Sequence, residues 1–377
     1  MPLSREQVCE LTSRKLSAAI PSLPSIKATL GLDGFVDEII AVVDKRHEGG
    51  KFEPVRTIDG LARKILGAAG QSSNYELVVK HVKLGGNGPI MANALASIGV
   101  SVTYIGNVGY PAVHPAFAEL ARKAKVVSIG EPGHTDALEF DDGKLMLGKH
   151  QTLHEVNWDN LISRVGRDQL KRLMDGSQLI AMVNWTMLPH MSRIWARMLD
   201  EIIPNPERHK RSLFIDLADP EKRTHHDILD ALKLLQRFQD QVDVILGLNL
   251  KESLEIADVL GLAGRTQPEE AVEENARNIR EQLGLACVVI HPRRSAAAAV
   301  EGESATFSGP FVQQPKISTG AGDHFNAGFC LGRVLGFGLE ESLCVGVATS
   351  GYYVRTTDSP TARQLADFIA ELPPPQG

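Results

Sequence analysis

Short, continuous apolar runs alternate with longer amphipathic stretches along most of this 377-residue chain, and this alternation limits the fold more than any other feature. A strand that is apolar throughout is covered on both faces. Seven such runs are predicted strands: 28–32, 102–105, 125–129, 179–184, 213–217, 242–248 and 286–291. Helical patterns precede or separate them: 4–20, 89–98, 191–203, 227–239 and 269–283. The sequence therefore predicts an α/β fold, a doubly wound and mostly parallel sheet flanked by helices on both faces.

Two segments interrupt this alternation. Residues 37–58 contain an apolar strand-like piece, a charged turn with two glycines and a second extended piece around Pro54. Residues 137–147 place two apolar pieces around Asp141-Asp142-Gly143, which predicts a β-hairpin. These two segments therefore stand outside the strand–helix alternation, the first with strand-like pieces and the second as a candidate hairpin.

Composition excludes several classes of partner. The apolar fraction of 43% suffices for a large core, while aromatic residues make up only 5% and the formal net charge is -6. These values predict no nucleic-acid partner. No run of 18 apolar residues occurs and the first residues lack the plan of a secretion signal, so we expect no membrane partner. The four cysteines form no C-x-x-C pair, which fits a cytoplasmic location.

The chemistry is concentrated in the run Gly320-Ala321-Gly322-Asp323, which precedes an apolar helix. Uncrowded backbone amides at a helix N-terminus bind anions such as phosphate. A carboxylate at that place would repel phosphate, but Asp323 there could take a proton from a hydroxyl that attacks phosphorus. This is the arrangement of a small-molecule kinase. The alternative is a glycine-rich turn in which Asp323 is an N-cap residue.

Two further carboxylates, Asp33 and Asp37, follow the first predicted strand. Open parallel sheets bind ligands at the carboxyl ends of their strands. A carboxylate can also accept hydrogen bonds from neighbouring hydroxyl groups of a polyol. Asp33 and Asp37 are therefore predicted to hold a polyol, or alternatively to cap a turn.

The run 318–329, together with the double-glycine stretch 84–109, resembles the two signatures of the ribokinase-like (PfkB-type) carbohydrate kinases. The resemblance covers roughly residues 28 to 360. It implies a ribokinase-like kinase domain over 28–370 with a small β lid inserted near 37–58 and 131–149. An N-terminal helical extension (1–27) and a disordered tail (371–377) would flank it. Two ordinary surface hairpins are the alternative to the lid.

The resemblance also implies which residues catalyse the reaction and which bind the acceptor. It makes Asp323 the general base, with the loop of Gly320, Ala321 and Gly322 stabilising charge on the transferred phosphoryl group. The implied acceptor-binding residues are Asp33, Asp37, Gly85, Gly86 and Asn87.

On the nucleotide side, Asn249-Leu250-Lys251-Glu252 is similar to the family's Asn-x-x-Glu motif, which implies that Asn249 and Glu252 orient Mg²⁺ through water. The alternative is an N-cap Asn followed by an ordinary Glu. Arg223, in a segment similar to the family's Asp-Pro-x-x-Arg, is implied to neutralise phosphate, or else belongs to a solvated loop. Thr319 is expected to contact the nucleotide. The implied cofactors are ATP and Mg²⁺.

The chain departs from the family pattern at three places. Ile90 replaces an Asn that contacts sugar in the family, and Ile317 replaces an Asp of a monovalent-cation site. His291-Pro292-Arg293 stands where the family has a Thr-x-Gly-x-x-Gly phosphate loop.

We therefore predict an ATP-dependent kinase that phosphorylates a hydroxyl of a sugar, nucleoside or related polyol. The alternative is a catalytically inactive sensor that binds a sugar or nucleotide on the same fold. A dinucleotide oxidoreductase is disfavoured because Phe325 stands at the third glycine of G-x-G-x-x-G. The family also implies a homodimer through paired lids.

Overall fold

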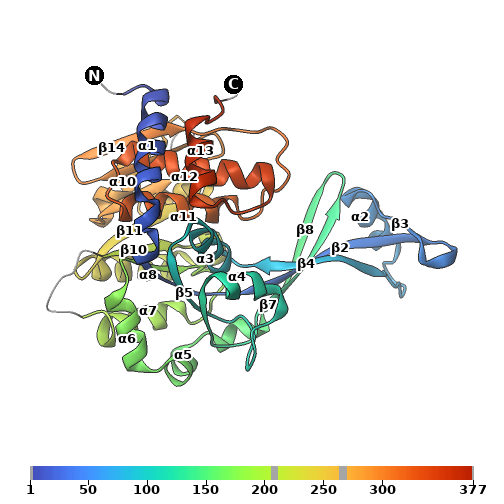
Figure 1. Ribbon diagram of the computed structural model, residues 1–377. Coiled ribbons are helices and arrows are strands. Elements are labelled where there is room, and N and C mark those ends of the chain that lie inside the picture. Colours follow the sequence, from blue (N-terminus) through green and yellow to red (C-terminus); the bar gives the residue numbers. More distant parts are fainter. Residues whose placement is uncertain (1–2, 205–210, 263–269, 376–377) are drawn as a thin grey trace.

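A nine-stranded sheet forms the centre of the molecule in the computed structural model, which describes residues 3–204, 211–262 and 270–375 (Figure 1). The strand order is β14-β13-β12-β11-β10-β9-β1-β5-β6. The strands are β1 (Lys27–Leu32), β5 (Ser101–Gly106), β6 (Lys125–Ser128), β9 (Leu179–Val183), β10 (Ser212–Asp216), β11 (Asp243–Leu248), β12 (Cys287–Ile290), β13 (Ser295–Val300) and β14 (Glu303–Ser308).

The pairs from β6 across to β12 are all parallel, whereas β13 and β14 add an antiparallel edge. The predicted α/β class and its mostly parallel sheet are therefore confirmed. The seven predicted strands are observed, with ends that differ by no more than one residue.

Helices cover both faces of this sheet, because alternate residues of each strand enter different cores. In β9, Ala181 packs into one core, while Ile180 and Met182 pack into the other. The first core is closed by α1 (Arg5–Ala19), α3 (Asn87–Ile98), α4 (Ala118–Lys123), α11 (Ala321–Val334), α12 (Leu339–Thr356) and α13 (Ala362–Ala370). The second is closed by α5 (Trp158–Val165), α6 (Arg167–Gly176), α7 (Met191–Glu201), α8 (His225–Gln239), α9 (Leu250–Val259) and α10 (Val272–Leu283).

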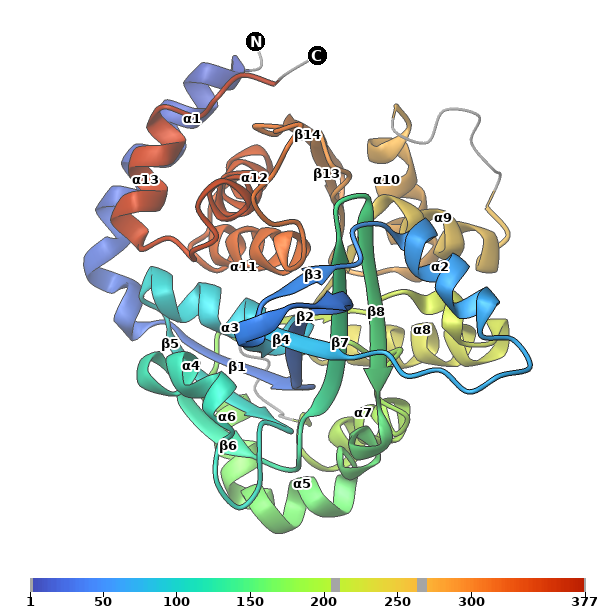
Figure 2. The same cartoon turned by 90° about the vertical axis from the view of Figure 1, so that its right-hand side faces the viewer.

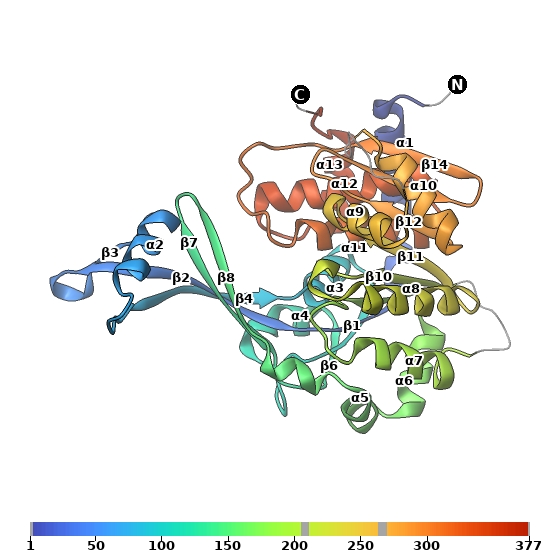
Figure 3. The ribbon, with the colours of Figure 1, turned by 180° about the vertical axis from the view of Figure 1, so that it is seen from behind.

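A second sheet of five strands extends away from the main body (Figures 1 and 3). It contains β2 (Phe35–Arg46), β3 (Phe52–Pro54), β4 (Leu77–Gly85), β7 (Gly133–Phe140) and β8 (Gly143–Lys149), with α2 (Ile58–Gly67) beside it. Both segments that interrupt the sequence pattern lie in this sheet, and the predicted hairpin is β7–β8. The sequence did not predict β4, whose residues are mostly exposed.

The first and last helices, α1 and α13, lie side by side (Figure 2). Arg5 of α1 donates a hydrogen bond to the carbonyl of Pro373 at 2.7 Å, and Leu372 is buried. Leu372 and Pro373 of the predicted tail therefore pack on the domain, whereas Pro374 and Pro375 are exposed and residues 376–377 lie outside the described residues. Among the residues described, no helix combines the length and apolar character needed to cross a bilayer.

Candidate active site

The N-terminus of α11 lies against the N-terminus of α3. Gly320 is the N-cap residue of α11 and has φ = +90°, a left-handed conformation that favours glycine. An added Cβ there would lie 3.2 Å from Ile90 of α3. The first backbone N–H groups of a helix lack intrahelical partners, so this close turn presents amide donors to an anion.

Asp323 belongs to the first turn of α11 and is not its N-cap, so the capping alternative is wrong. Its side chain is 8% exposed and lines a cavity. Oδ1 accepts a hydrogen bond from Nδ2 of Asn87 at 3.0 Å. Burial raises the pKa of Asp323 to about 8, the Asn87 bond lowers it, and the charges of Asp33 and Glu252 raise it. A carboxylate with a raised pKa is a stronger proton acceptor once it is ionised.

The first cavity, of about 640 Å³, lies between the main sheet and the second sheet, and we call it the acceptor cavity. The predicted residues that line it are Asp37, Gly86, Asn87, Asn249, Glu252, Thr319, Gly320, Gly322 and Asp323. Asp37 is 6% exposed, and burial raises its pKa. Gly85 lies beside Asp37, since an added Cβ would come within 2.5 Å of the carboxyl carbon. The site therefore combines residues from β2, β4, α3 and α11.

Asp33 has a different position from the one predicted, because it does not line this cavity. Its carboxylate accepts hydrogen bonds from the backbone N–H groups of Asn87 and Gly88, both at 2.9 Å, and from Nδ2 of Asn184 at 2.8 Å. Burial raises its pKa to about 6, and these three bonds lower it. Asp33 therefore fixes the N-terminus of α3, which agrees with the capping alternative.

The second cavity, of about 650 Å³, lies on the other side of the α11 N-terminus, and we call it the donor cavity. Four residues line both cavities: Asn249, His291, Thr319 and Gly322. The remaining wall includes Pro310, Phe311 and residues of α12 such as Val347 and Gly351. The two cavities therefore meet at the amide-lined turn beside Asp323.

Oxygen atoms suited to Mg²⁺ gather at the carboxyl ends of β10 and β11. Asn249 and Glu252 form a capping box at the start of α9: Asn249 Oδ1 accepts from the N–H of Glu252, and Glu252 Oε2 accepts from the N–H of Asn249. Asp216 is also buried, and burial followed by the charges of Glu252 and Asp323 raises its pKa. A cation would relieve this repulsion, and Mg²⁺ prefers oxygen ligands. The residues therefore fit a magnesium ion, with Asp216 added to the predicted pair.

Arg223 does not line either cavity. Its guanidinium donates to the carbonyls of Trp185, Thr186 and Leu188 and lies 4.9 Å from the centre of the Trp185 ring. The structure therefore gives Arg223 a role in packing rather than the predicted contact with phosphate. The neighbouring Lys222 lines the acceptor cavity instead.

Several cavity residues lay outside the predicted site. Asn184, which we did not include in it, directly follows β9, has φ = +60° and lines the acceptor cavity, as do Met187 and His150. The end of a parallel strand was the only sequence signal for Asn184. His150 could not be found in this way, because it depends on how the second sheet folds against the first.

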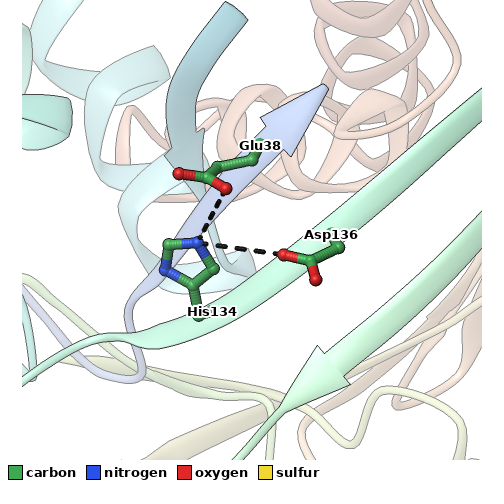
Figure 4. A group of neighbouring side chains, drawn as sticks. All are labelled: Glu38, His134 and Asp136. Carbon is green, nitrogen blue, oxygen red and sulfur yellow. Dashed lines mark ion pairs between the residues drawn. The ribbon is translucent and has the colours of Figure 1, made fainter. Parts of the chain in front are cut away.

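A group of ionisable side chains lies on the second sheet, with Glu38 on β2 and His134 and Asp136 on β7 (Figure 4). His134 Nε2 is 3.3 Å from Glu38 Oε2 and 4.0 Å from Asp136 Oδ1. Asp136 also pairs with Lys149 at 2.8 Å. Alternation along β2 turns Glu38 to the face opposite Asp37, so this group is separate from the acceptor cavity.

Solved structures with the same fold are sugar and nucleoside kinases. The ribokinase of Thermotoga maritima is similar with a TM-score of 0.62 at 17% identity, over 92% of this chain and 99% of that chain. Phosphofructokinase-2 of Escherichia coli, solved with substrates and products, has a TM-score of 0.60 at 15% identity, over 92% of this chain and 99% of that one. These likenesses show the ribokinase-like fold, including its separate smaller sheet.

The fold, its two adjoining cavities and the comparisons with known sequences define a carbohydrate kinase. A family model described as prokaryotic ketohexokinase matches residues 8–372. The ketohexokinase of Haloferax volcanii is 31% identical over 367 residues, which is 96% of each chain. The chain belongs to the prokaryotic ketohexokinase family.

Proposed function

We propose that this kinase transfers the terminal phosphoryl group of ATP to a hydroxymethyl group of a ketohexose, with Asp323 as the general base. One observation carries the proposal. The buried carboxylate of Asp323 lines the acceptor cavity at the amide-lined turn where that cavity meets the donor cavity. The ketohexose is proposed because the matching family model and the Haloferax volcanii relative carry that substrate in their names.

The reaction follows from this arrangement. The acceptor hydroxyl loses its proton to the Asp323 carboxylate while its oxygen forms a bond to the terminal phosphorus. The bond from that phosphorus to the bridging oxygen breaks, and ADP leaves with the electron pair. The loop of Gly320, Ala321 and Gly322 stabilises the charge on the transferred group through the backbone N–H groups of Gly320 and Gly322, since the N–H of Ala321 donates to the carbonyl of Ser318 at 3.1 Å. Thr319, which lines both cavities, contacts the phosphate chain.

Three residues hold the ketohexose in the acceptor cavity under this proposal. Asp37 and Asn184 accept hydrogen bonds from sugar hydroxyls, and Asn184 Oδ1 is buried with no protein donor among the described residues. Gly86, with φ = +97°, allows the backbone before Asn87 to approach the sugar closely. Holding the hydroxyl beside both Asp323 and the phosphate supplies much of the rate enhancement.

Asn249, Glu252 and Asp216 are proposed to hold Mg²⁺ through its water shell. When bound, Mg²⁺ neutralises charge on the phosphate chain. The protein side chains would orient the coordinated water by hydrogen bonds. Burial and then neighbouring carboxylates raise the pKa values of Asp216 and Glu252, and this concentration of buried acidic groups supports the assignment.

The second sheet is proposed to act as a lid over the sugar. Asp37 of β2, Thr135 of β7, and Met146 and Gly148 of β8 already line the acceptor cavity. Closure of such a lid would exclude water from the reaction. The homodimer implied by the resemblance stays a prediction, which sedimentation equilibrium can test.

The test of the proposed function is an assay of purified protein with ATP, Mg²⁺ and a panel of ketohexoses, aldohexoses, pentoses and nucleosides. The product would be identified by ³¹P NMR, which distinguishes a sugar phosphate from free phosphate. Turnover of a ketohexose with kcat/KM well above those of the other acceptors is expected. Binding of a sugar without phosphate transfer to any acceptor would contradict the proposal and favour the inactive sensor.

A further inference from the structure

His291 lies at the junction of the donor and acceptor cavities and has no role in the proposed reaction so far. It follows β12, and its backbone N–H donates to the carbonyl of Leu248 at 3.0 Å. This bond fixes His291 beside the start of α9. The next residues, Pro292 and Arg293, provide no glycine, so the backbone here cannot form a glycine-rich phosphate loop.

The imidazole ring of His291 is held against the N-terminus of α11. Its centre lies 4.7 Å from that of the Phe325 ring, with 35° between the planes. A Cβ added to Gly322 would lie 3.2 Å from Cε1 of His291 and 3.9 Å from Nε2. The Cε1–Nε2 edge of the ring therefore faces the amide-lined turn, and the absence of a side chain at Gly322 leaves room between them.

In the described parts of the chain, no side-chain hydrogen bond joins a ring nitrogen of His291 to another residue. Burial lowers the pKa of His291 to about 4, against a bond to its own backbone that raises it, so the ring is neutral near pH 7. A neutral imidazole carries one N–H donor and one acceptor nitrogen. With so low a pKa it is a weaker base than Asp323, whose pKa is raised to about 8. His291 is therefore better suited to act as a fixed hydrogen-bond donor that faces the anion site than as a base.

We propose that the ring N–H of His291 donates a hydrogen bond to an oxygen of the terminal phosphate of the nucleotide and positions this group for transfer. This inference rests on the proposed function, because it takes the junction of the cavities as the place of the transferred group. Such a side-chain donor would supply a contact that the glycine-free loop of residues 291–294 cannot make with backbone amides. The nearby Arg293 is exposed at the rim of the donor cavity and is not fixed by comparable packing.

Two substitutions distinguish the contribution of the ring N–H group to nucleotide binding from the contribution of the ring shape. His291→Phe keeps an aromatic ring against Phe325 but has no donor, whereas His291→Gln keeps an N–H donor at a similar distance from the backbone. Calorimetry would measure the binding of adenosine and of a non-hydrolysable ATP analogue with Mg²⁺ to both variants.

The expected result is that His291→Phe weakens binding of the ATP analogue by about 10- to 100-fold, as for a lost hydrogen bond to a charged group. Adenosine should bind as to the wild type, which also shows that the variant is folded. His291→Gln should stay within a few-fold of wild type for both ligands. The proposal is overturned if His291→Phe binds the ATP analogue normally, if it loses adenosine equally, or if Gln is as harmful as Phe.

This outcome is separate from the test of the proposed function. If the wild-type protein turns over no acceptor, the proposed phosphoryl transfer is wrong. The nucleotide affinities of the His291 variants would still decide whether His291 binds the terminal phosphate.

Discussion

Asn87 donates a hydrogen bond from Nδ2 to Oδ1 of Asp323 over 3.0 Å, although 236 positions separate them in the chain. This contact joins the N-terminus of α3 to that of α11 and brings the two glycine-rich stretches of the sequence into one site. The bond favours the ionised form of Asp323, while burial favours the protonated form. Asn87 therefore tunes the proton affinity of the proposed base.

The first prediction concerns the pH dependence of catalysis. Since Asp323 must be ionised to accept a proton and its pKa is raised to about 8, kcat/KM should rise with pH and level off above about 8. Asn87→Ala removes a bond that lowers this pKa, so the midpoint should move to higher pH. Asn93→Ala is the matched control, because Asn93 lies on the same helix but donates to Ser359. An unchanged midpoint in Asn87→Ala would contradict the assignment.

The second prediction concerns stability. The pKa values of Asp33 and Asp323 in the folded state, about 6 and about 8, lie above the ordinary value of 3.8. These two carboxyl groups therefore bind more protons in the folded state than in the unfolded state between about pH 4 and 8, and their contribution to stability should fall as pH rises through this range. We compare the change in unfolding free energy from pH 6 to pH 8 in the wild type and in Asp323→Asn. Because the variant lacks the titrating carboxyl group, its unfolding free energy at pH 8, relative to pH 6, should be more favourable than that of the wild type by about 1–2 kcal/mol.

Urea denaturation at both pH values measures this difference. Asp240→Asn, at an exposed carboxylate, is the control that should leave the slope unchanged. An equal change of unfolding free energy from pH 6 to 8 in the wild type and in Asp323→Asn would show that the pKa of Asp323 is not raised.

The third prediction concerns magnesium. Glu252→Gln should raise the Mg²⁺ concentration for half-maximal activity by about 10-fold or more, because a carboxylate that orients coordinated water becomes neutral. Calorimetric titration of Mg²⁺ into the ADP complex should show the same weakening. Glu255→Gln, one turn later on α9 and outside both cavities, should behave as wild type. Equal Mg²⁺ requirements in the two variants would show that Glu252 does not orient Mg²⁺-bound water.

The fourth prediction concerns the sugar. Gly85→Ala would bring a methyl group within 2.5 Å of the Asp37 carboxyl carbon and displace that side chain. The acceptor kcat/KM should fall by about 10- to 100-fold, while nucleotide affinity stays unchanged. Gly67→Ala, at the end of α2 with no atom within 4 Å of the added Cβ, is the control. A normal acceptor KM in Gly85→Ala would argue against Asp37 as a sugar contact.

Much of the fold was predictable because buried parallel strands have a strong sequence pattern. The continuous apolar runs identified β1, β5, β6 and β9 to β12 almost to the residue. Strand β4 was missed because an exposed strand with residues such as Lys80 and His81 lacks that pattern. Its position is set by pairing with β2 instead, which depends on contacts distant in sequence.

The candidate site was predictable only where one stretch of sequence carries the chemistry. The loop at Asp323 and the pair Asn249–Glu252 line the cavities, and Asn249 is also the N-cap of α9, as in the alternative interpretation. The positions of Asp33 and Arg223 could not be inferred, since spacing does not show which carbonyls or amides their side chains meet. His291 was visible in the sequence only as a departure from the family pattern.

The central claim is that Asp323 removes the proton of the acceptor hydroxyl. Its most direct test is the single-turnover rate of Asp323→Asn with saturating ketohexose and ATP–Mg²⁺, measured beside the affinities for both ligands. The account predicts a rate lower by about 10²–10⁴-fold, with both affinities within a few-fold of wild type. A rate near that of wild type would contradict it.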